Sequence, residues 1–495
     1  MEDKSALDVF LNPDSVAVIG ATERPGSWGS FIMHGLLSRD YSGKVYPVNK
    51  NAEQVFGLPA FRHINEINEP IGLAILTIPA DSVERTIAEC GRRQVKGATI
   101  ITAGYGESSK KGKEQEKALV RIARSYGMRI LGPNVSGTFN LHADFNGSAS
   151  PAEHLLCNRI GAVCQGGYAF YDLLASGFSK GMGVGKFIHT GNECDVTATD
   201  FLEYFENDPE VEVILMYLET IRDARRFVET ASRISKLKPI VVYKAGKTQG
   251  SARAAESHTG ALSGVREIYE GVLHQTGIIA VPSMELLLPL GHALLERPPM
   301  RGRRVAIITM GGSWGVALSD SLEEMGLTLP ELSPKLQQSL RSIGMPPRAS
   351  TRNPVDIGAS GLFFEEEIIL AIGRDVLFSG EVDALILHGM GRPGMLEKDA
   401  PSRLRLFLDI NKRIISGYNQ MEDEIGLPVM LGSIFTPWES QVICDLNEQG
   451  VRIYNRLDEI AQILSLLHKN WQNKQKLMGY QAGDQVGHAM GSLRR

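Results

Sequence analysis

The chain has 495 residues, of which 43% are hydrophobic and 22% charged, and its formal net charge is −5. A chain of this length and composition is expected to form about three globular domains. Its mild acidity does not favour a nucleic-acid-binding surface, and no apolar run is long enough to span a membrane. We therefore expect neither a nucleic acid nor a membrane as a partner. The five cysteines lack the spacing of metal ligands and the N-terminus lacks a signal pattern. We therefore expect a cytoplasmic protein without a metal site.

The first predicted strand, Ser15–Ile19, leads into the loop GATERPGSWGS and an apolar helix. The runs KVYPV, LAILTIP, GATIITAG and RILGPN follow in alternation with helical segments, which predicts a parallel α/β sheet. The glycine loop does not match G-x-G-x-x-G strictly, so a phosphate site at a helix N-terminus and a plain tight turn both remain open. Lys50, Thr102 and Asn134 follow strands of this sheet, and we expect them to meet in one crevice.

The same strand–glycine–helix pattern occurs twice more. Arg159–Val163 leads into CQGGYAFYDLLASGF, and Val305–Thr309 leads into MGGSWGVALSDSLEEMG. Each is followed by further alternating strands and helices, so the sequence predicts an α/β protein with three doubly wound domains. The polar stretch at 141–158 and the Pro- and Arg-rich stretch at 296–304 are the expected boundaries.

One histidine has unusual surroundings. The predicted strand Pro239–Tyr243 ends in KAGKTQGSARAAESHTGALSG, which places His258 among small residues just before a helix. Lys244, Lys247 and Arg253 in this loop favour an anion. His258 could serve as a ligand, a general base, a covalent phosphate carrier or only a loop histidine. No second histidine or cysteine has metal-ligand spacing, and no G-x-S-x-G elbow is present for a hydrolase triad.

Other strand ends carry groups that could act with His258. Glu219 closes the strand VEVILMYLE, where a carboxylate can accept a hydrogen bond from an imidazole N–H. The loops Cys164–Gly167 and Met310–Gly312 open helices whose N-termini could hold phosphate. His189 and His388 also end predicted strands and are the alternatives to His258.

Four motifs can be read together: the His258 loop, the YLE upstream of it, GN-x-x-DV at 191–196 and GPN-x-x-G at 132–137. They resemble the NDP-forming acyl-CoA synthetases, which are relatives of the α subunit of succinyl-CoA synthetase. The resemblance covers residues 8–468 and follows the arrangement of the α subunit of two-subunit ADP-forming acetyl-CoA synthetases. It implies a Rossmann-like CoA-binding domain at 1–145, a phosphohistidine ligase domain at 155–298, a second flavodoxin-like ligase domain at 302–470 and a polar tail at 471–495.

The resemblance also implies roles for individual residues. His258 resembles the histidine that carries phosphate, and Glu219 resembles the acid that holds it. The positions that cradle the phosphohistidine are Gln165, Gly166, Gly167, Gly311 and Gly312. The positions that bind CoA are Gly20, Thr22, Lys50, Ile101, Thr102 and Asn134, and Tyr171 corresponds to a tyrosine near the acyl group.

The chain also departs from the family pattern. Cys164-Gln165-Gly166-Gly167 replaces Ser-Gln-Ser-Gly, which removes two hydroxyls beside the phosphate. Tyr168 follows this loop as a bulky residue. Ser313-Trp314-Gly315 replaces Gly-Pro-Gly, and His189 stands where serine is common.

The predicted function is that of the CoA-binding, phosphohistidine-carrying subunit of an acyl-CoA synthetase, which acts on a carboxylic acid or its acyl-CoA. No Walker P-loop occurs in the chain, so the resemblance implies a hetero-oligomer with an ATP-grasp β-type subunit that holds ATP or ADP with Mg²⁺. The alternative is a catalytically weak CoA- or nucleotide-sensing module that regulates a partner. A nicotinamide dehydrogenase would need a strict G-x-G-x-x-G and an acid where this chain has Lys50.

Overall fold

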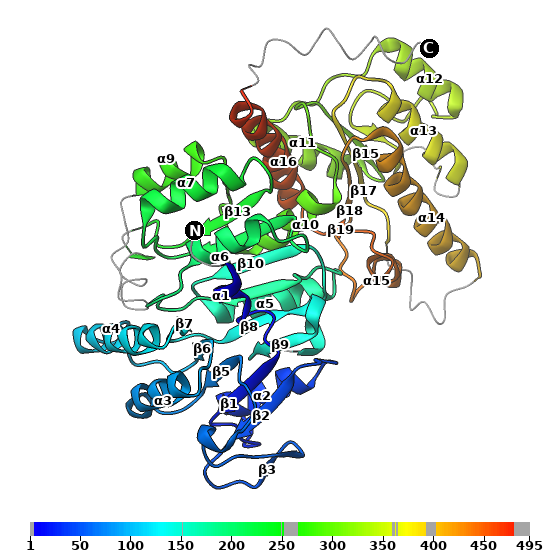
Figure 1. Cartoon of the computed structure of the whole chain (residues 1–495). Coiled ribbons are helices and arrows are strands. Elements are labelled where there is room, and N and C mark those ends of the chain that lie inside the picture. The colour runs from blue at the N-terminus through cyan, green and yellow to red at the C-terminus, as the bar shows by residue number, and fades with distance from the viewer. Residues whose placement is uncertain are drawn as a thin grey trace, which may run out of the picture. The chain divides into compact units, whose positions relative to one another are not determined.

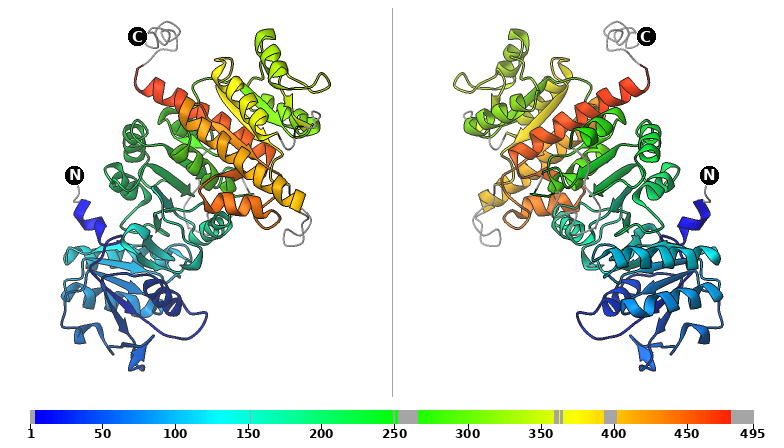
Figure 2. Two further views of the ribbon diagram at one scale, coloured as in Figure 1. Left: turned by 90° about the vertical axis from the view of Figure 1, so that its right-hand side faces the viewer. Right: turned by 90° about the vertical axis from the view of Figure 1, so that its left-hand side faces the viewer.

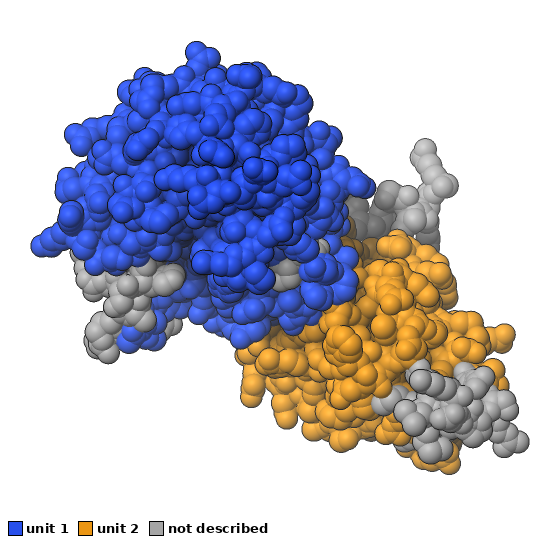
Figure 3. Space-filling view, turned by 90° about the horizontal axis from the view of Figure 1, so that it is seen from below, with its two compact units in different colours: residues 1–178, 183–291 blue, residues 179–182, 292–495 orange. Residues whose placement is uncertain are grey.

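The computed structural model describes residues 4–150, 152–248, 250–251, 266–358, 362, 365–392 and 402–479 (Figure 1). The chain divides into two compact units, one of residues 1–178 and 183–291 and the other of residues 179–182 and 292–495 (Figure 3). The first unit contains two of the large sheets and the second unit contains one.

The first sheet of the first unit is parallel throughout, with strand order β2-β1-β5-β6-β7. Its strands are β1 (Ser15–Ile19), β2 (Lys44–Val48), β5 (Leu73–Leu76), β6 (Gly97–Ile100) and β7 (Arg129–Leu131). Every residue of β1, β5, β6 and β7 is buried, which is typical of parallel strands covered by helices on both faces. A two-stranded hairpin, β3 (Gln54–Val55) and β4 (Leu58–Pro59), lies outside this sheet.

One short helix precedes the first sheet, and the other helices alternate with its strands. They are α1 (Lys4–Asp8), α2 (Trp28–Leu37), α3 (Ala80–Arg92) and α4 (Lys110–Ser125), with the short 3₁₀ segment η1 (Ile64–Glu66). Figure 1 shows α3 and α4 side by side along the sheet. The Ser27 side chain caps α2 by accepting from the Ser30 N–H, and Ser109 caps α4 in the same way through Gly112. These serines mark the helix starts that sequence rules expect.

The second sheet has seven strands in the order β14-β13-β12-β10-β11-β8-β9. The strands are β8 (Gly137–Asn140), β9 (Phe145–Ser148), β10 (Ile160–Cys164), β11 (Lys186–His189), β12 (Val213–Leu218), β13 (Ile240–Lys244) and β14 (Ile279–Ala280). The strands β10 to β14 run parallel, while β8 pairs antiparallel with both β11 and β9. The helices are α5 (Gly167–Phe178), α6 (Ala198–Glu206), α7 (Ala224–Ile234) and α9 (Arg266–Gln275), with η2 (Leu141–Ala143), η3 (Ala152–His154) and η4 (Met284–Leu286).

The two sheets of the first unit are joined by a loop that we call the latch, residues 191–196. Its Cys194 and Val196 N–H groups donate to the carbonyls of Gly132 and Ile130. The Asp195 carboxylate accepts from Arg129 and from the Ile130 N–H. One buried apolar cluster also runs through both sheets. The carboxyl ends of both sheets therefore belong to one packed body.

The second unit contains a parallel sheet of order β16-β15-β17-β18-β19. The strands are β15 (Val305–Thr309), β16 (Val355–Asp356), β17 (Ala384–His388), β18 (Val429–Gly432) and β19 (Ile453–Tyr454). The helices are α11 (Gly312–Glu324), α12 (Pro334–Ile343), α13 (Glu366–Phe378), α14 (Ser402–Ile425), α15 (Gln441–Glu448) and α16 (Leu457–Leu477), and α10 (Leu287–Glu296) crosses the boundary between the units. Figure 2 shows the long helices α14 and α16 from two sides.

Arg297 comes from the stretch expected to be a linker, but its side chain is buried in the second unit. It donates to the Glu422 carboxylate, which also accepts from the Val429 N–H at 3.0 Å. The predicted α/β class with three wound sheets is confirmed, with β8 and β9 as the antiparallel edge of the second sheet. No helix in the described part of the chain is long and apolar enough to cross a membrane.

Candidate functional site

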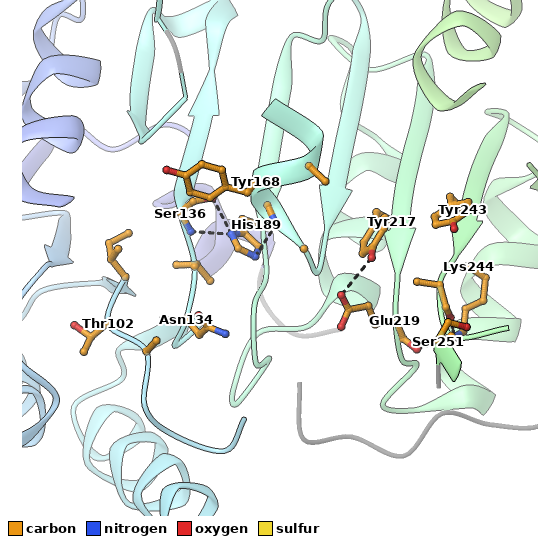
Figure 4. A pocket seen from close by; sticks show the side chains of 18 of the residues that line it. Thr102, Asn134, Ser136, Tyr168, His189, Tyr217, Glu219, Tyr243, Lys244 and Ser251 are labelled. Carbon is orange, nitrogen blue, oxygen red and sulfur yellow. Dashed lines mark hydrogen bonds between the residues drawn. The ribbon is translucent and has the colours of Figure 1, made fainter. Parts of the chain in front are cut away.

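A cavity of about 1130 Å³ lies in the first unit, between the carboxyl ends of its two sheets. The first sheet contributes residues that follow β5, β6 and β7, and the second contributes residues at the ends of β10, β11, β12 and β13. Figure 4 shows Thr102 and Asn134 on one side, Glu219 and Lys244 on the other, and His189 between them. The cavity is therefore lined by both sheets, as expected for a ligand site at strand ends.

The CoA-type positions divide into two groups. Ile101, Thr102 and Asn134 line the cavity, whereas Gly20, Thr22 and Lys50 do not. Thr102 Oγ1 donates to the Ile78 carbonyl at 2.6 Å, and Asn134 has a left-handed backbone with φ of 63°.

The three remaining positions lie at the ends of β1 and β2. Gly20 has φ of 97°, and a Cβ placed there would lie 2.6 Å from the Oγ1 of Thr77, which lines the cavity. Thr22 accepts from the Arg24 N–H at 3.2 Å, and the Lys50 side chain is exposed. The glycine turn thus packs directly behind the cavity wall.

The loop after β10 lines the cavity with its backbone, and its Gln165 side chain supports a neighbouring loop. Gly166 and Gly167 line the cavity, with Gly167 as the first residue of α5. The Gln165 Oε1 accepts from the N–H groups of Glu219 (2.6 Å) and Thr220 (2.8 Å), and its Nε2 donates to the Thr220 carbonyl (2.9 Å). The Gln165 amide therefore fixes the loop that carries Glu219.

Glu219 lies at the far end of the cavity, where only 4% of its surface is exposed. The Tyr217 hydroxyl donates to its Oε1 at 3.3 Å, and burial together with this carboxylate raises the pKa of Tyr217. The Lys244 ammonium donates to the Glu219 carbonyl at 2.7 Å and lies 4.3 Å from the centre of the Tyr269 ring. Burial lowers the pKa of Lys244 to about 8. The Glu219 carboxyl group and the Lys244 amino group thus occupy the same end of the cavity.

The middle of the cavity is built on a hydrogen-bonded trio. The Ser136 N–H donates to Nδ1 of His189 at 2.8 Å, and the Tyr171 hydroxyl donates to Ser136 Oγ at 2.8 Å. The Nε2 atom of the same ring accepts from the Gly167 N–H at 3.1 Å and lies 3.0 Å from the Gln165 carbonyl oxygen. Tyr171 is buried behind the wall, whereas Ser136 and His189 line it. His189 thus connects the start of β8 to the loop after β10 and also lines the cavity.

His258 lies outside the described residues. Lys247, Thr248 and Ser251, which precede it in the chain, all line the cavity. Tyr269, which follows it, contacts Lys244. The described chain on both sides of the predicted histidine loop therefore lies at the Glu219 end of the cavity.

Gly311 and Gly312 belong to the second unit, where Gly311 caps α11. The Trp314 ring, in the first turn of α11, lies 5.5 Å from the ring of His388. His388 is buried, its Nδ1 has no partner, and burial lowers its pKa to about 4. Within the described residues, no group of three or more His, Cys, Asp and Glu side chains is arranged to hold a metal ion.

Several lining residues were not among the predicted site positions, notably Trp28, Ser136, Tyr168 and Tyr217. Trp28 belongs to the first glycine loop and Tyr168 directly follows the second, so the loops were a usable signal. Tyr217 is the one half-buried residue of the otherwise buried strand β12, and the sequence does not distinguish it from an ordinary strand residue.

Comparison with known domain families gives three matches. Residues 14–139 match the CoA binding domain, residues 158–294 the succinyl-CoA ligase like flavodoxin domain, and residues 305–388 the Ligase-CoA domain. The cavity lies within the first two of these matched regions.

Whole-chain relatives agree with these matches. The α subunit of ADP-forming acetate–CoA ligase II of Pyrococcus furiosus is 40% identical over 355 residues, which is 72% of this chain and 76% of the relative. The α subunit of ligase I of the same organism is 34% identical over 95% of this chain and 99% of its own length. The structure is also similar to a dinucleotide-forming acetyl-coenzyme A synthetase of Ca. Korarchaeum cryptofilum, solved with phosphate and ADP, at a TM-score of 0.83 and 31% identity over 97% and 100% of the two chains.

Proposed function

Since this chain belongs to the NDP-forming acyl-CoA synthetases, as a relative of the α subunits of ADP-forming acetate–CoA ligases, we propose that it is the CoA-binding and phosphohistidine-carrying subunit of such an enzyme. The reaction converts acyl-CoA, phosphate and ADP to a carboxylic acid, CoA and ATP. The observation that carries the proposal is the single cavity that joins Thr102 and Asn134 at one end to Glu219 and Lys244 at the other.

The CoA end suits the pantetheine arm of CoA. Ile101 offers an apolar surface there, and Thr102 and Asn134 offer polar groups close to it. Lys50, exposed at the end of β2, supplies a positive charge for a phosphate of CoA outside the cavity. The site thus combines an apolar channel with polar groups at its edge, which is the usual composition of a small-molecule site.

The first chemical step is attack of an orthophosphate oxygen on the thioester carbonyl, with the CoA thiolate as leaving group, which gives an acyl phosphate. The positive end of the α5 dipole, at Gly166 and Gly167, and the Lys244 charge favour an anion in this position. Most of the rate enhancement then comes from positioning and charge neutralisation.

In the second step a ring nitrogen of His258 attacks the phosphorus, and the carboxylate leaves. Glu219 accepts a hydrogen bond from the other ring nitrogen, which orients the imidazole and stabilises its positive charge. Gln165 and Tyr217 hold Glu219 in place for this role. The phosphoryl group then passes to ADP.

We further propose that the nucleotide and Mg²⁺ are held by a separate ATP-grasp subunit, because the relatives are named as α subunits. Gly311 and Gly312, at the start of α11, would meet the phosphoryl group during its transfer. The active enzyme is then a hetero-oligomer.

The test uses the whole chain with its ATP-grasp partner, labelled ATP and Mg²⁺. We expect acid-labile, base-stable label on this chain, and we expect His258→Ala to lose the label and the turnover while CoA binding persists. The exposed His34 supplies the matched control, since His34→Ala should keep the label. Undiminished turnover of His258→Ala would exclude the phosphohistidine role.

The altered loop Cys164–Gly167 favours the second candidate, a CoA-sensing module, because two family hydroxyls are missing there. The same experiment separates the two. A wild-type chain that binds CoA and its partner but takes no label would be a sensor rather than an enzyme subunit.

A further inference from the structure

The loops that line the cavity meet behind its wall at one residue of the latch, Asn192. Only 2% of its surface is exposed. Its N–H donates to the Pro133 carbonyl at 3.0 Å, and its Oδ1 accepts from the Asn134 side-chain amide at 3.3 Å. Both partners lie in the loop after β7, and Asn134 lines the CoA end of the cavity. Asn192 therefore supports this end of the cavity from behind.

The Asn192 side chain also holds the loop after β6. Its Nδ2 donates to the carboxylates of Glu107 and Glu116, and these commit both of its hydrogens. The two carboxylates in turn accept from the N–H groups of residues 104–106. Thr102, at the start of the same loop, lines the cavity. The loops after β6 and β7 are thus joined through one buried amide, and both polar atoms of that amide have partners.

The Asn192 carbonyl reaches the opposite end of the cavity. It accepts from Nη2 of Arg222, which lies three residues after Glu219 in the loop that follows β12. The start of this loop is held by Gln165, whose Oε1 accepts from the Glu219 and Thr220 N–H groups. The loop that carries Glu219 is therefore fixed at two points, and the second point belongs to the latch.

The Arg222 bond differs from the other bonds of Asn192 in its access to water. The Arg222 side chain is 43% exposed, and its Nε lies 4.0 Å from the buried carboxylate of Glu193. Water can replace the partner of an exposed guanidinium, whereas opening a bond of the buried Asn192 amide leaves an unpaired polar group. The link between Arg222 and the latch is therefore the one of these contacts that can form and break in the folded protein.

Under the proposed function, CoA engages Asn134 and orthophosphate binds at the Glu219 end, on the other side of the cavity (Figure 4). Each ligand orders one of the loops that meet at Asn192, so the shared bonds are already in place when the second ligand binds. We propose that Asn192 and Arg222 are positioning residues that couple the two ends of the cavity, so that CoA and orthophosphate each raise the affinity for the other. This inference rests on the proposed function.

The test measures the affinity of the whole chain for CoA by calorimetry, with and without saturating orthophosphate and at constant ionic strength. This measurement needs no partner subunit. We expect phosphate to tighten CoA binding by about fivefold in the wild type, which is the lower end of typical couplings between two sites. By reciprocity, saturating CoA should tighten the binding of phosphate by the same factor.

Arg222→Met removes the donor to the Asn192 carbonyl and keeps an unbranched side chain. We expect it to reduce the effect of phosphate to less than about twofold. CoA binding without phosphate should persist, since Arg222 does not line the cavity. Arg222→Lys should restore part of the effect, because an ammonium can donate to the same carbonyl. A merely structural defect would change both CoA affinities by one factor and leave their ratio intact.

Asn192→Ala cuts the same link on the CoA side. It keeps the backbone carbonyl that Arg222 binds but removes the amide that holds Asn134 and the two carboxylates. We expect it to lose the effect of phosphate as Arg222→Met does. The Arg222 variants decide the test on their own if this buried substitution prevents folding.

Arg225→Met is the matched control, since Arg225 is 90% exposed and pairs with Glu229 on the same helix. It should show the wild-type effect of phosphate. Equal or weaker CoA affinity of the wild type in the presence of phosphate overturns the inference and leaves the proposed function standing. A full effect of phosphate in Arg222→Met or in folded Asn192→Ala also overturns it. Absence of CoA binding in the wild type overturns the proposed function as well.

Discussion

Gly167 has no room for a side chain, because neighbouring atoms rather than its backbone conformation would exclude a Cβ. An added Cβ would lie 2.3 Å from His189 Nδ1 and 2.4 Å from Ser136 Oγ, and both of these atoms belong to a hydrogen-bonded trio that cannot move freely. At Gly166 the nearest atoms to an added Cβ are a ring carbon of Tyr217 at 3.0 Å and Glu219 Oε1 at 3.3 Å. The two neighbouring glycines therefore differ in how much each tolerates substitution.

We predict that Gly167→Ala lowers the free energy of unfolding by about 2 kcal/mol or more, as overpacking of a rigid site does. Gly166→Ala should cost less than about 1 kcal/mol, since only a small shift is needed. Urea unfolding of both variants checks this. Equal stability of the two variants would mean that the His189 trio adjusts without cost.

The lowered pKa of Lys244 predicts how the free energy of unfolding changes with pH. Burial lowers its pKa from 10.5 to about 8, so between these values the unfolded chain binds more protons at this amine than the native chain does. The contribution of this amine to the free energy of unfolding must then rise with pH over that range. We expect the free energy of unfolding of the wild type, measured against Lys244→Met, to increase from pH 8 to pH 10.5. A decrease over this range would show that the amine is not desolvated.

At the scale of single elements, the latch is the feature that determines how the first two sheets meet. The Asp195 carboxylate is almost fully buried and accepts from Arg124, Arg129 and the Ile130 N–H. Loss of one partner from a buried ion pair leaves uncompensated charge, at a cost of about 3–5 kcal/mol.

We therefore predict that Asp195→Asn destabilises the first unit by about 3 kcal/mol and weakens CoA binding, because the latch holds the segment that carries Asn134. Glu229→Gln, in an exposed pair with Arg225, is the control and should change stability by less than about 0.5 kcal/mol. If a destabilised Asp195→Asn protein kept its CoA affinity, the latch would have no influence on binding in the cavity.

The sequence predicted those elements whose signal is local. β1, β10 and β15 are buried apolar runs before glycine turns, and the fold follows from their repetition. Arg297 looked like a linker residue, since its buried partner Glu422 is far away in the sequence. The place of β8 between β11 and β9 in the second sheet was equally hidden, because strand pairing is a long-range property.

The residues of the site also divide into those with a local sequence signal and those that depend on distant parts of the chain. Glu219 and the glycine loops could be placed at strand ends from the sequence, and the structure brings Glu219, Gly166 and Gly167 into one cavity. The hydrogen bonds of Gln165 to Glu219 and Thr220 could not be foreseen, because a buried amide that supports a loop has no sequence pattern. The glycine loops pointed to the neighbourhood of Trp28 and Tyr168, but not to their place in the cavity wall, since the direction of a side chain at a helix start depends on packing.

At the scale of the whole molecule, each of the two compact units contains at least one apolar core cluster of its own. We predict two transitions in calorimetric unfolding. Glu422→Gln should lower only the transition of the second unit, by about 3 kcal/mol in stability, because it removes the charge that faces buried Arg297. Gly167→Ala should lower only the other transition. A single transition that both variants shift equally would show that the units unfold together.

The position of Trp28 has a consequence for spectroscopy. The chain has four tryptophans, and the other three, Trp314, Trp438 and Trp471, all lie in the second unit. Trp28 is therefore the sole indole of the first unit, and it stands in the wall of the cavity. A variant in which the other three are phenylalanine would emit from this position alone. Its emission maximum and its quenching by iodide would then report the filling of the cavity directly, without a label and without turnover.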